Sequence, residues 1–141
     1  MRPDFPPLVP GSGAQAYVIE GRPVSGKNHQ AIRHRGPGRA PFVTIGRVAR
    51  DWQADAVGQL ARQRLDARHS VLTGPLALLY VAYQPADRCD LDNMEAALFD
   101  ALKKARVIED DGLIVDHRGA KRVDRTRPRF ELVVWPLAAS P

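Results

Sequence analysis

The sequence lacks the features that mark secreted and membrane-spanning proteins. A single residue of the 141, Cys89, is a cysteine, so no disulfide can form within the chain. Such sparing use of cysteine favours a reducing cytoplasm. No apolar run approaches the roughly 20 residues that span a bilayer, and residues 1–13 contain no apolar signal segment. We therefore expect a cytoplasmic protein that makes no contact with a membrane.

Aromatic residues and lysines are also scarce. Aromatic residues make up 6% of the chain, and arginine supplies most of the 21 basic residues. With 16 acidic residues, the formal net charge is +5. The planar guanidinium group binds phosphate well, so nucleic acid is a fitting partner. The same charge would also serve simply to keep a small domain soluble, and composition alone leaves both interpretations open.

The length of the chain fits one domain with one hydrophobic core. Apolar periodicity predicts four strands and two helices. The strands are expected over residues 15–20, 76–83, 113–123 and 129–135, and the helices over 46–66 and 91–105. The stripe of the first helix is expected to include Val48, Trp52, Ala56, Leu60 and either Arg64 or Leu65. This β-α-β-α-β-β order predicts an α/β (α+β) domain on one mixed sheet.

The ends of the chain and one internal stretch lack such periodicity. Residues 1–14 are expected to form a flexible arm, 15–136 the domain, and 137–141 a disordered tail. Residues 21–41 are rich in glycine, proline and basic side chains, which argues against regular structure. We interpret this stretch as a loop that faces DNA, and the alternative is a solvated linker.

Acidic residues concentrate at both ends of the second predicted helix. Asp90-Leu91-Asp92-Asn93 stands between a predicted strand and this helix, and Glu109-Asp110-Asp111 follows the helix. Two unpaired carboxylates about 4 Å apart repel each other by roughly 4 kcal/mol at an effective dielectric constant near 20. A divalent cation removes this repulsion, and Mg²⁺ favours one or two carboxylates together with phosphate oxygens and water. Asp111 can return to complete the cluster.

A purely structural role is the alternative for these acids. Asp90 and Asp92 also suit the cap and first turn of a helix, while Asp110 and Asp111 suit a turn. Spacing alone does not decide between capping and metal binding.

A wider set of motifs resembles the RusA family of Holliday junction resolvases over about residues 17–135. The motifs that carry the resemblance are D-L-D-N at 90–93, D-A-L at 100–102, the pair Asp110-Asp111 before a strand, the loop Pro23-Val24-Ser25-Gly26-Lys27-Asn28, and Lys121. The resemblance implies a homodimeric endonuclease that hydrolyses phosphodiesters in four-way DNA junctions during recombination and repair. Magnesium is the implied cofactor, with Mn²⁺ as a substitute.

The resemblance also implies roles for single residues. Asp90, Asp92 and Asp111 correspond to catalytic, metal-binding carboxylates, Asn93 supports them, and Asp110 is the less favoured member of its pair. The residues expected to contact DNA are Lys27, Asn28, Arg33, Arg35, Arg39 and Lys121.

One position departs from the family pattern. The family has an essential lysine one helical turn after the second aspartate, and Ala96 occupies that position here. Such a lysine would stabilise charge that develops on the phosphate. Three explanations stay open: an engineered substitution, another basic group such as Lys27 or Lys121 in its place, or a catalytically impaired homologue that binds branched DNA without cutting it.

Overall fold

A computed structural model of the chain describes residues 8–24, 30–33, 36–38, 42–87 and 90–137, with only the backbone of 30–33 and 42–45. The elements in chain order are β1 (Gln15–Glu20), β2 (Gln30–Arg33), β3 (Phe42–Ile45), α1 (Arg47–Asp66), β4 (Leu76–Gln84), α2 (Leu91–Lys104), the 3₁₀ helix η1 (Asp111–Leu113), β5 (Ile114–Val123) and β6 (Arg129–Pro136). The predicted flexible arm and tail lie partly outside these residues.

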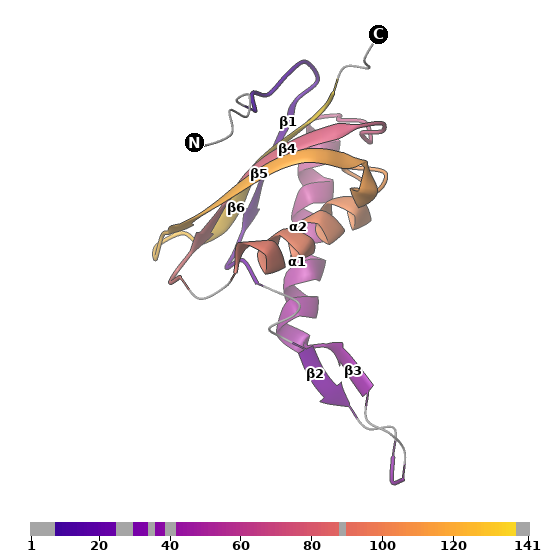
Figure 1. Ribbon diagram of the computed structural model, residues 1–141, viewed down its shortest axis with the longest axis vertical. Coiled ribbons are helices and arrows are strands. Elements are labelled where there is room, and N and C mark those ends of the chain that lie inside the picture. The colour runs from indigo at the N-terminus through magenta and orange to yellow at the C-terminus, as the bar shows by residue number, and fades with distance from the viewer. Residues whose placement is uncertain (1–7, 25–29, 34–35, 39–41, 88–89, 138–141) are drawn as a thin grey trace, which may run out of the picture.

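The main sheet has four strands in the order β1-β6-β4-β5 (Figure 1). β4 and β5 are parallel and are joined through α2, whereas β6 pairs antiparallel with both β1 and β4. The chain is therefore a small α+β domain on a mixed sheet with two helices, and the predicted β-α-β-α-β-β order of these elements is confirmed.

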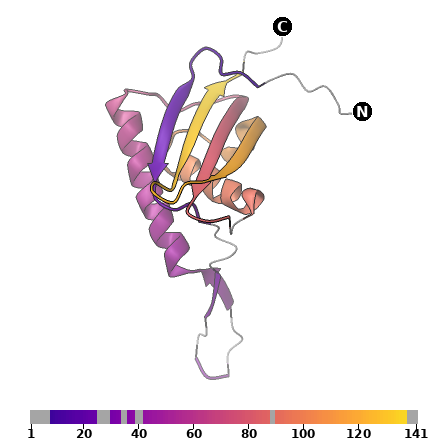
Figure 2. The same cartoon turned by 90° about the vertical axis from the view of Figure 1, so that its left-hand side faces the viewer.

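Both helices cover the same face of the main sheet, and the other face is open in Figure 2. The core lies between the helices and the sheet, where Leu60 of α1, Leu98 of α2 and Phe130 of β6 are fully buried. Tyr80 of β4 fills the space above Gly119 of β5, and a side chain at position 119 would collide with its ring. This close contact explains the glycine in the middle of a strand.

Two details of the first half differ from the sequence prediction. The stretch predicted to be irregular contains β2 and β3, which form an antiparallel hairpin that extends beyond the start of α1 (Figure 1). Each strand has four residues, too few for a clear alternating pattern. On α1, Val48 and Leu65 are 55% and 64% exposed, because the buried stripe runs through Ala49, Trp52, Ala56 and Leu60.

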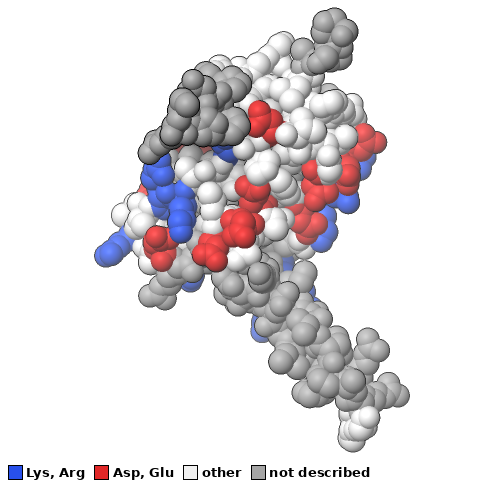
Figure 3. All heavy atoms as spheres, viewed as in Figure 1, with Lys and Arg blue, Asp and Glu red and all other residues white. Residues whose placement is uncertain are grey.

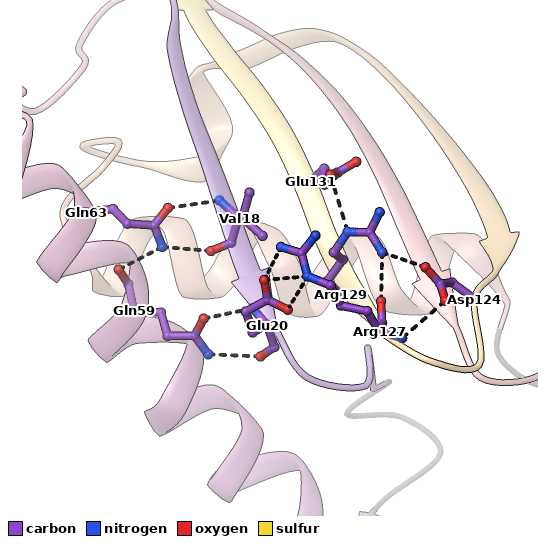
Figure 4. A network of polar contacts seen from close by, with 8 residues as sticks. All are labelled: Val18, Glu20, Gln59, Gln63, Asp124, Arg127, Arg129 and Glu131. Carbon is purple, nitrogen blue, oxygen red and sulfur yellow. Dashed lines mark hydrogen bonds and ion pairs between the residues drawn. The ribbon is translucent and has the colours of Figure 1, made fainter.

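The outer edge of β1 is bound by two glutamine side chains of α1 (Figure 4). Gln63 accepts from the Val18 amide at 2.9 Å and donates to its carbonyl at 2.7 Å. Gln59 makes the same pair of bonds with Glu20, at 2.7 and 2.9 Å. Four residues of helix rise about 6 Å and two residues of strand about 6.8 Å, so the two spacings match. The amides therefore take the place of a neighbouring strand.

Within the described residues, no helix has both the length and the apolar character needed to cross a bilayer.

Candidate active site

Asp90 and Asp92 lie at the start of α2, as the sequence predicted. Asp90 is the N-cap residue by backbone conformation, with φ −71° and ψ 142°, but its carboxylate makes no capping hydrogen bond. Asp92 stands in the first turn, where the helix dipole favours negative charge. Both side chains are exposed, and neither has a hydrogen bond or ion pair within the part of the chain that the structure describes. Asp90 therefore does not act as a side-chain cap.

Ala96 is exposed on α2, four residues after Asp92, and Asn93 beside Asp92 is half-buried. A lysine at position 96 would extend into solvent from the same side of the helix as Asp92. No side chain at this position provides the positive charge expected from the family resemblance.

Glu95 forms a polar cluster with two side chains of the main sheet. This cluster was not predicted from the sequence. The Tyr80 hydroxyl donates to Glu95 Oε2 at 2.5 Å, and His117 Nδ1 lies 3.2 Å from Oε1. The His117 ring also meets Phe99 edge-on at 5.4 Å. Burial, followed by the hydrogen bond to Glu95 and the charges of Glu95 and Asp92, raises the pKa of Tyr80. His117 is thus held against α2, and strand alternation was the signal that could have revealed its position.

Asp110 and Asp111 lie at the opposite end of α2. Lys103 Nζ is 3.1 Å from Asp110 Oδ1, and the Gly112 amide donates to Asp110 Oδ2 at 3.2 Å. These bonds, that of Lys103 first, hold the pKa of Asp110 below its usual range. Asp110 thus caps η1 and forms a turn, which is the structural role considered from the sequence. Asp111 is the first residue of η1. Its negative charge, after the hydrogen bond and the charge of Asp110, helps to raise the pKa of Lys103.

One chain does not bring the three predicted aspartates together. Lys103 follows Asp92 by 11 residues, which is about 16 Å of helix. Among the described residues no group of three or more His, Cys, Asp or Glu side chains is arranged to hold a metal ion. Figure 3 shows acidic side chains over both halves of α2, mixed with basic ones near its C-terminal end. Asp90 and Asp92 lie at the start of α2, and Asp111 lies beyond its other end.

The residues predicted to contact DNA are only partly described. Lys121 Nζ lies 2.8 Å from Asp87 Oδ1, so this lysine is already engaged in an ion pair. Arg33 ends β2, and its side chain is outside the described part, as are Lys27, Asn28, Arg35 and Arg39.

Comparison with known proteins agrees with this architecture. The model of the family described as Endodeoxyribonuclease RusA matches residues 20–134. The chain is also 40% identical over 113 residues to the crossover junction endodeoxyribonuclease RusA of Escherichia coli O139:H28 (strain E24377A / ETEC). That alignment covers 78% of this chain and 87% of the E. coli protein. The chain therefore belongs to the RusA endodeoxyribonuclease family.

Proposed function

We propose that this protein is a divalent-metal-dependent endonuclease that cuts four-way DNA junctions in recombination and repair. The observation that carries the proposal is the pair of exposed, unpaired carboxylates at the start of α2, in a chain that matches the family from residue 20 to 134. The junction substrate is carried over from the name of the similar E. coli protein. A DNA substrate is also consistent with action in the cytoplasm.

The donor set at the start of α2 fits a hard divalent cation. Asp90 and Asp92 would hold it through their carboxylate oxygens, which suit Mg²⁺, with Mn²⁺ as a substitute. When bound, such an ion lowers the pKa of a water molecule and neutralises charge on the phosphate. No described cation pairs with either carboxylate, so neither must break an ion pair to bind the metal.

A second copy of the chain would complete the predicted ligand set. Because α2 separates Asp111 from Asp92 within one chain, we propose a homodimer in which Asp111 of one copy joins Asp90 and Asp92 of the other. A homodimer also provides two active sites, which paired cuts across a four-way junction require.

The other side chains in this proposal have two roles: some bind the DNA, and others hold Glu95 away from the place where a DNA phosphate would lie. Tyr80 and His117 both bind Glu95 and direct its carboxylate towards the sheet, away from the solvent-facing position 96. Asn93 supports the aspartates in this proposal. Phosphate contacts are assigned to Lys27, Asn28, Arg33, Arg35, Arg39 and Lys121.

The alanine at position 96 favours a second candidate function. A chain without the lysine of the family would still bind branched DNA through its basic side chains while cutting it slowly or not at all. The two candidates share the fold and the substrate, and they differ in whether phosphodiesters are hydrolysed.

Cleavage of a synthetic four-way junction in the presence of Mg²⁺ tests the proposal. Asp92→Asn should abolish cleavage, because it removes a metal ligand, while junction retention in a gel stays equal or becomes tighter with one repelling charge fewer. Omitting the divalent ion provides the matched control. Unchanged cleavage by Asp92→Asn would contradict the site, and retention without any cleavage by the unmodified chain would favour the binding protein.

A further inference from the structure

The two edge strands of the main sheet, β1 and β5, differ in what lies against their outer backbone groups. Gln59 and Gln63 bind the backbone groups of Val18 and Glu20 on the edge at β1. β5 forms the opposite edge, and in the described part of the chain the sheet has no strand beyond it. Such an edge presents a row of backbone donors and acceptors that another strand can pair with. The asymmetry marks β5 as the edge at which a further strand can add.

The side chains of β5 are compatible with such pairing. Val115 and Val123 are 63% and 56% exposed, so both leave apolar surface on this edge strand. Charged side chains commonly protect an edge strand. Here His117 binds Glu95 and Lys121 binds Asp87, so both are held by acidic partners of their own chain.

We propose that β5 pairs antiparallel with β5 of a second copy, about a two-fold axis at Gly119. In this register Val115 faces Val123 of the second copy, and Asp116 faces its Arg122. Facing residues in antiparallel strands lie on the same side of a sheet and contact each other. His117 faces Lys121 of the second copy, and each keeps its acidic partner within its own chain. The strand therefore matches itself at Val115 with Val123 and at Asp116 with Arg122, as an isologous interface requires.

This interface explains how two chains would share the ligands of the proposed metal site, and it rests on the homodimer of the proposed function. β5 begins just after Asp111 and ends at Val123, which pairs with Gln84 at the end of β4, on the side where Asp90 and Asp92 follow. Antiparallel pairing places the start of one β5 beside the end of the other. Asp111 of each copy is thereby brought to the end of the sheet at which Asp90 and Asp92 of its partner lie.

A competing interface is the open face of the main sheet. Apolar side chains there, including Val18, Leu79, Val81 and Val133, line a shallow hollow. The glutamine side chains of α1 bind the neighbouring β1 edge (Figure 4), and neither helix lies over this face (Figure 2). We favour β5 because its residues match each other in one register, whereas the hollow indicates no particular partner.

Molar mass across a concentration series, measured by light scattering or sedimentation, tests the interface. The unmodified chain should be dimeric, and V115K/V123K should raise its dissociation constant about 10²-fold or more, because lysines then face each other. V115K/V123E should restore the dimer, since each lysine faces a glutamate. Val48→Lys, at an exposed site on α1, is the control that should change nothing. A monomeric unmodified chain, or a dimer that survives V115K/V123K and dissociates with V81K, overturns the proposal.

Cysteine cross-linking tests the register itself. In a background with Cys89→Ser, chains carrying V115C are mixed with chains carrying V123C under mild oxidation. Facing Cα atoms in an antiparallel pair are about 4.5 to 5.5 Å apart, which suits a disulfide. Covalent dimers should form in the mixture and not in either variant alone. Equal cross-linking of V115C with itself overturns the register.

Both measurements are independent of nuclease activity. A dimer that forms as described but never cuts DNA contradicts the proposed function and leaves the interface intact. Cleavage by a chain that stays monomeric contradicts the interface alone.

Discussion

Two regions of the molecule use aspartate in opposite ways. In the turn between β5 and β6, Asp124 Oδ1 accepts from the Thr126 hydroxyl at 2.9 Å and from the amides of Thr126 and Arg127, both at 3.1 Å. Its Oδ2 lies 2.9 Å from Arg129 Nη1 (Figure 4). Asp90 and Asp92 have no such partners in the described residues. A carboxylate with its partners in place holds the fold, whereas the exposed carboxylates of Asp90 and Asp92 leave their oxygens to solvent and to the metal ion that we propose.

The largest change in cleavage rate is expected from adding a positively charged side chain near Asp90 and Asp92 at the start of α2. Ala96→Lys should raise the rate of junction cleavage by about 10²- to 10³-fold, because the ammonium group stabilises charge developing on the phosphate. Single-turnover cleavage with Mg²⁺ measures the gain. Ala96→Gln, similar in length but uncharged, is the matched control. An equal rate in the lysine variant and the unmodified chain would mean that another basic group already serves, and Lys27 would be the next residue to replace.

Removing one charge from each region should separate stability from activity. Asp124→Asn should lower Tm and leave cleavage unchanged, because it breaks the Arg129 ion pair. Asp92→Asn should abolish cleavage and change Tm little, because the lost attraction to the helix dipole offsets the relieved repulsion of Asp90 and Glu95. Thermal unfolding without metal, beside the cleavage assay, measures both. A lower Tm for Asp92→Asn would give that residue a structural role and weaken the comparison.

The acid dependence of stability gives a finer test of the paired region. The Thr126 hydroxyl, followed by Arg129 and the Arg127 and Thr126 amides, lowers the pKa of Asp124 from 3.8 to about 2. A lowered folded-state pKa contributes stability above the unfolded-state value, and this contribution is lost as pH falls through the folded-state value. The Tm difference between the unmodified chain and Asp124→Asn should be constant above about pH 5 and should narrow as pH approaches 2. A difference that widens in acid would contradict this assignment.

The smallest effect is expected at Asp110. The side chains of Lys103 and Asp110 are 48% and 52% exposed, and solvent screens such a pair. Asp110→Asn should therefore change Tm little and leave cleavage intact, whereas Asp111→Asn should lose cleavage. Parallel assays of the two neighbours measure the contrast. If only Asp110→Asn lost cleavage, Asp110 would be the aspartate required for cleavage and Asp111 would not.

Most of the main sheet was predictable because its elements carry strong apolar patterns. β1 matches the prediction at both ends, and α1 and α2 differ from it by one residue at most at each end. The hairpin of β2 and β3 was not predicted, since glycine, proline and basic residues interrupt two strands of four residues each. The buried stripe of α1 was wrongly predicted to include Val48, and of the alternatives Arg64 and Leu65 the leucine is exposed, because an apolar residue near a helix end need not face the core.

The candidate site was predictable in part. The position of Asp90 and Asp92 at a helix start follows from the junction of an apolar run with a helical pattern. The location of Asp111 depends on the length of α2, which carries it to the other end of the helix. The bonds of Glu95 with Tyr80 and His117 come from three separate elements, and only the tertiary structure brings those elements together.

The glutamine side chains along β1 have a consequence for how many chains can join. A sheet with two adhesive sides grows without limit into a fibre, as in amyloid. Gln59 and Gln63 bind the backbone groups of Val18 and Glu20 on the β1 edge, which leaves β5 as the edge of the described sheet where we propose that a second chain adds. Assembly through β5 would then stop at two chains. In the proposed dimer, the two glutamine side chains on α1 would therefore limit further growth of the sheet at β1.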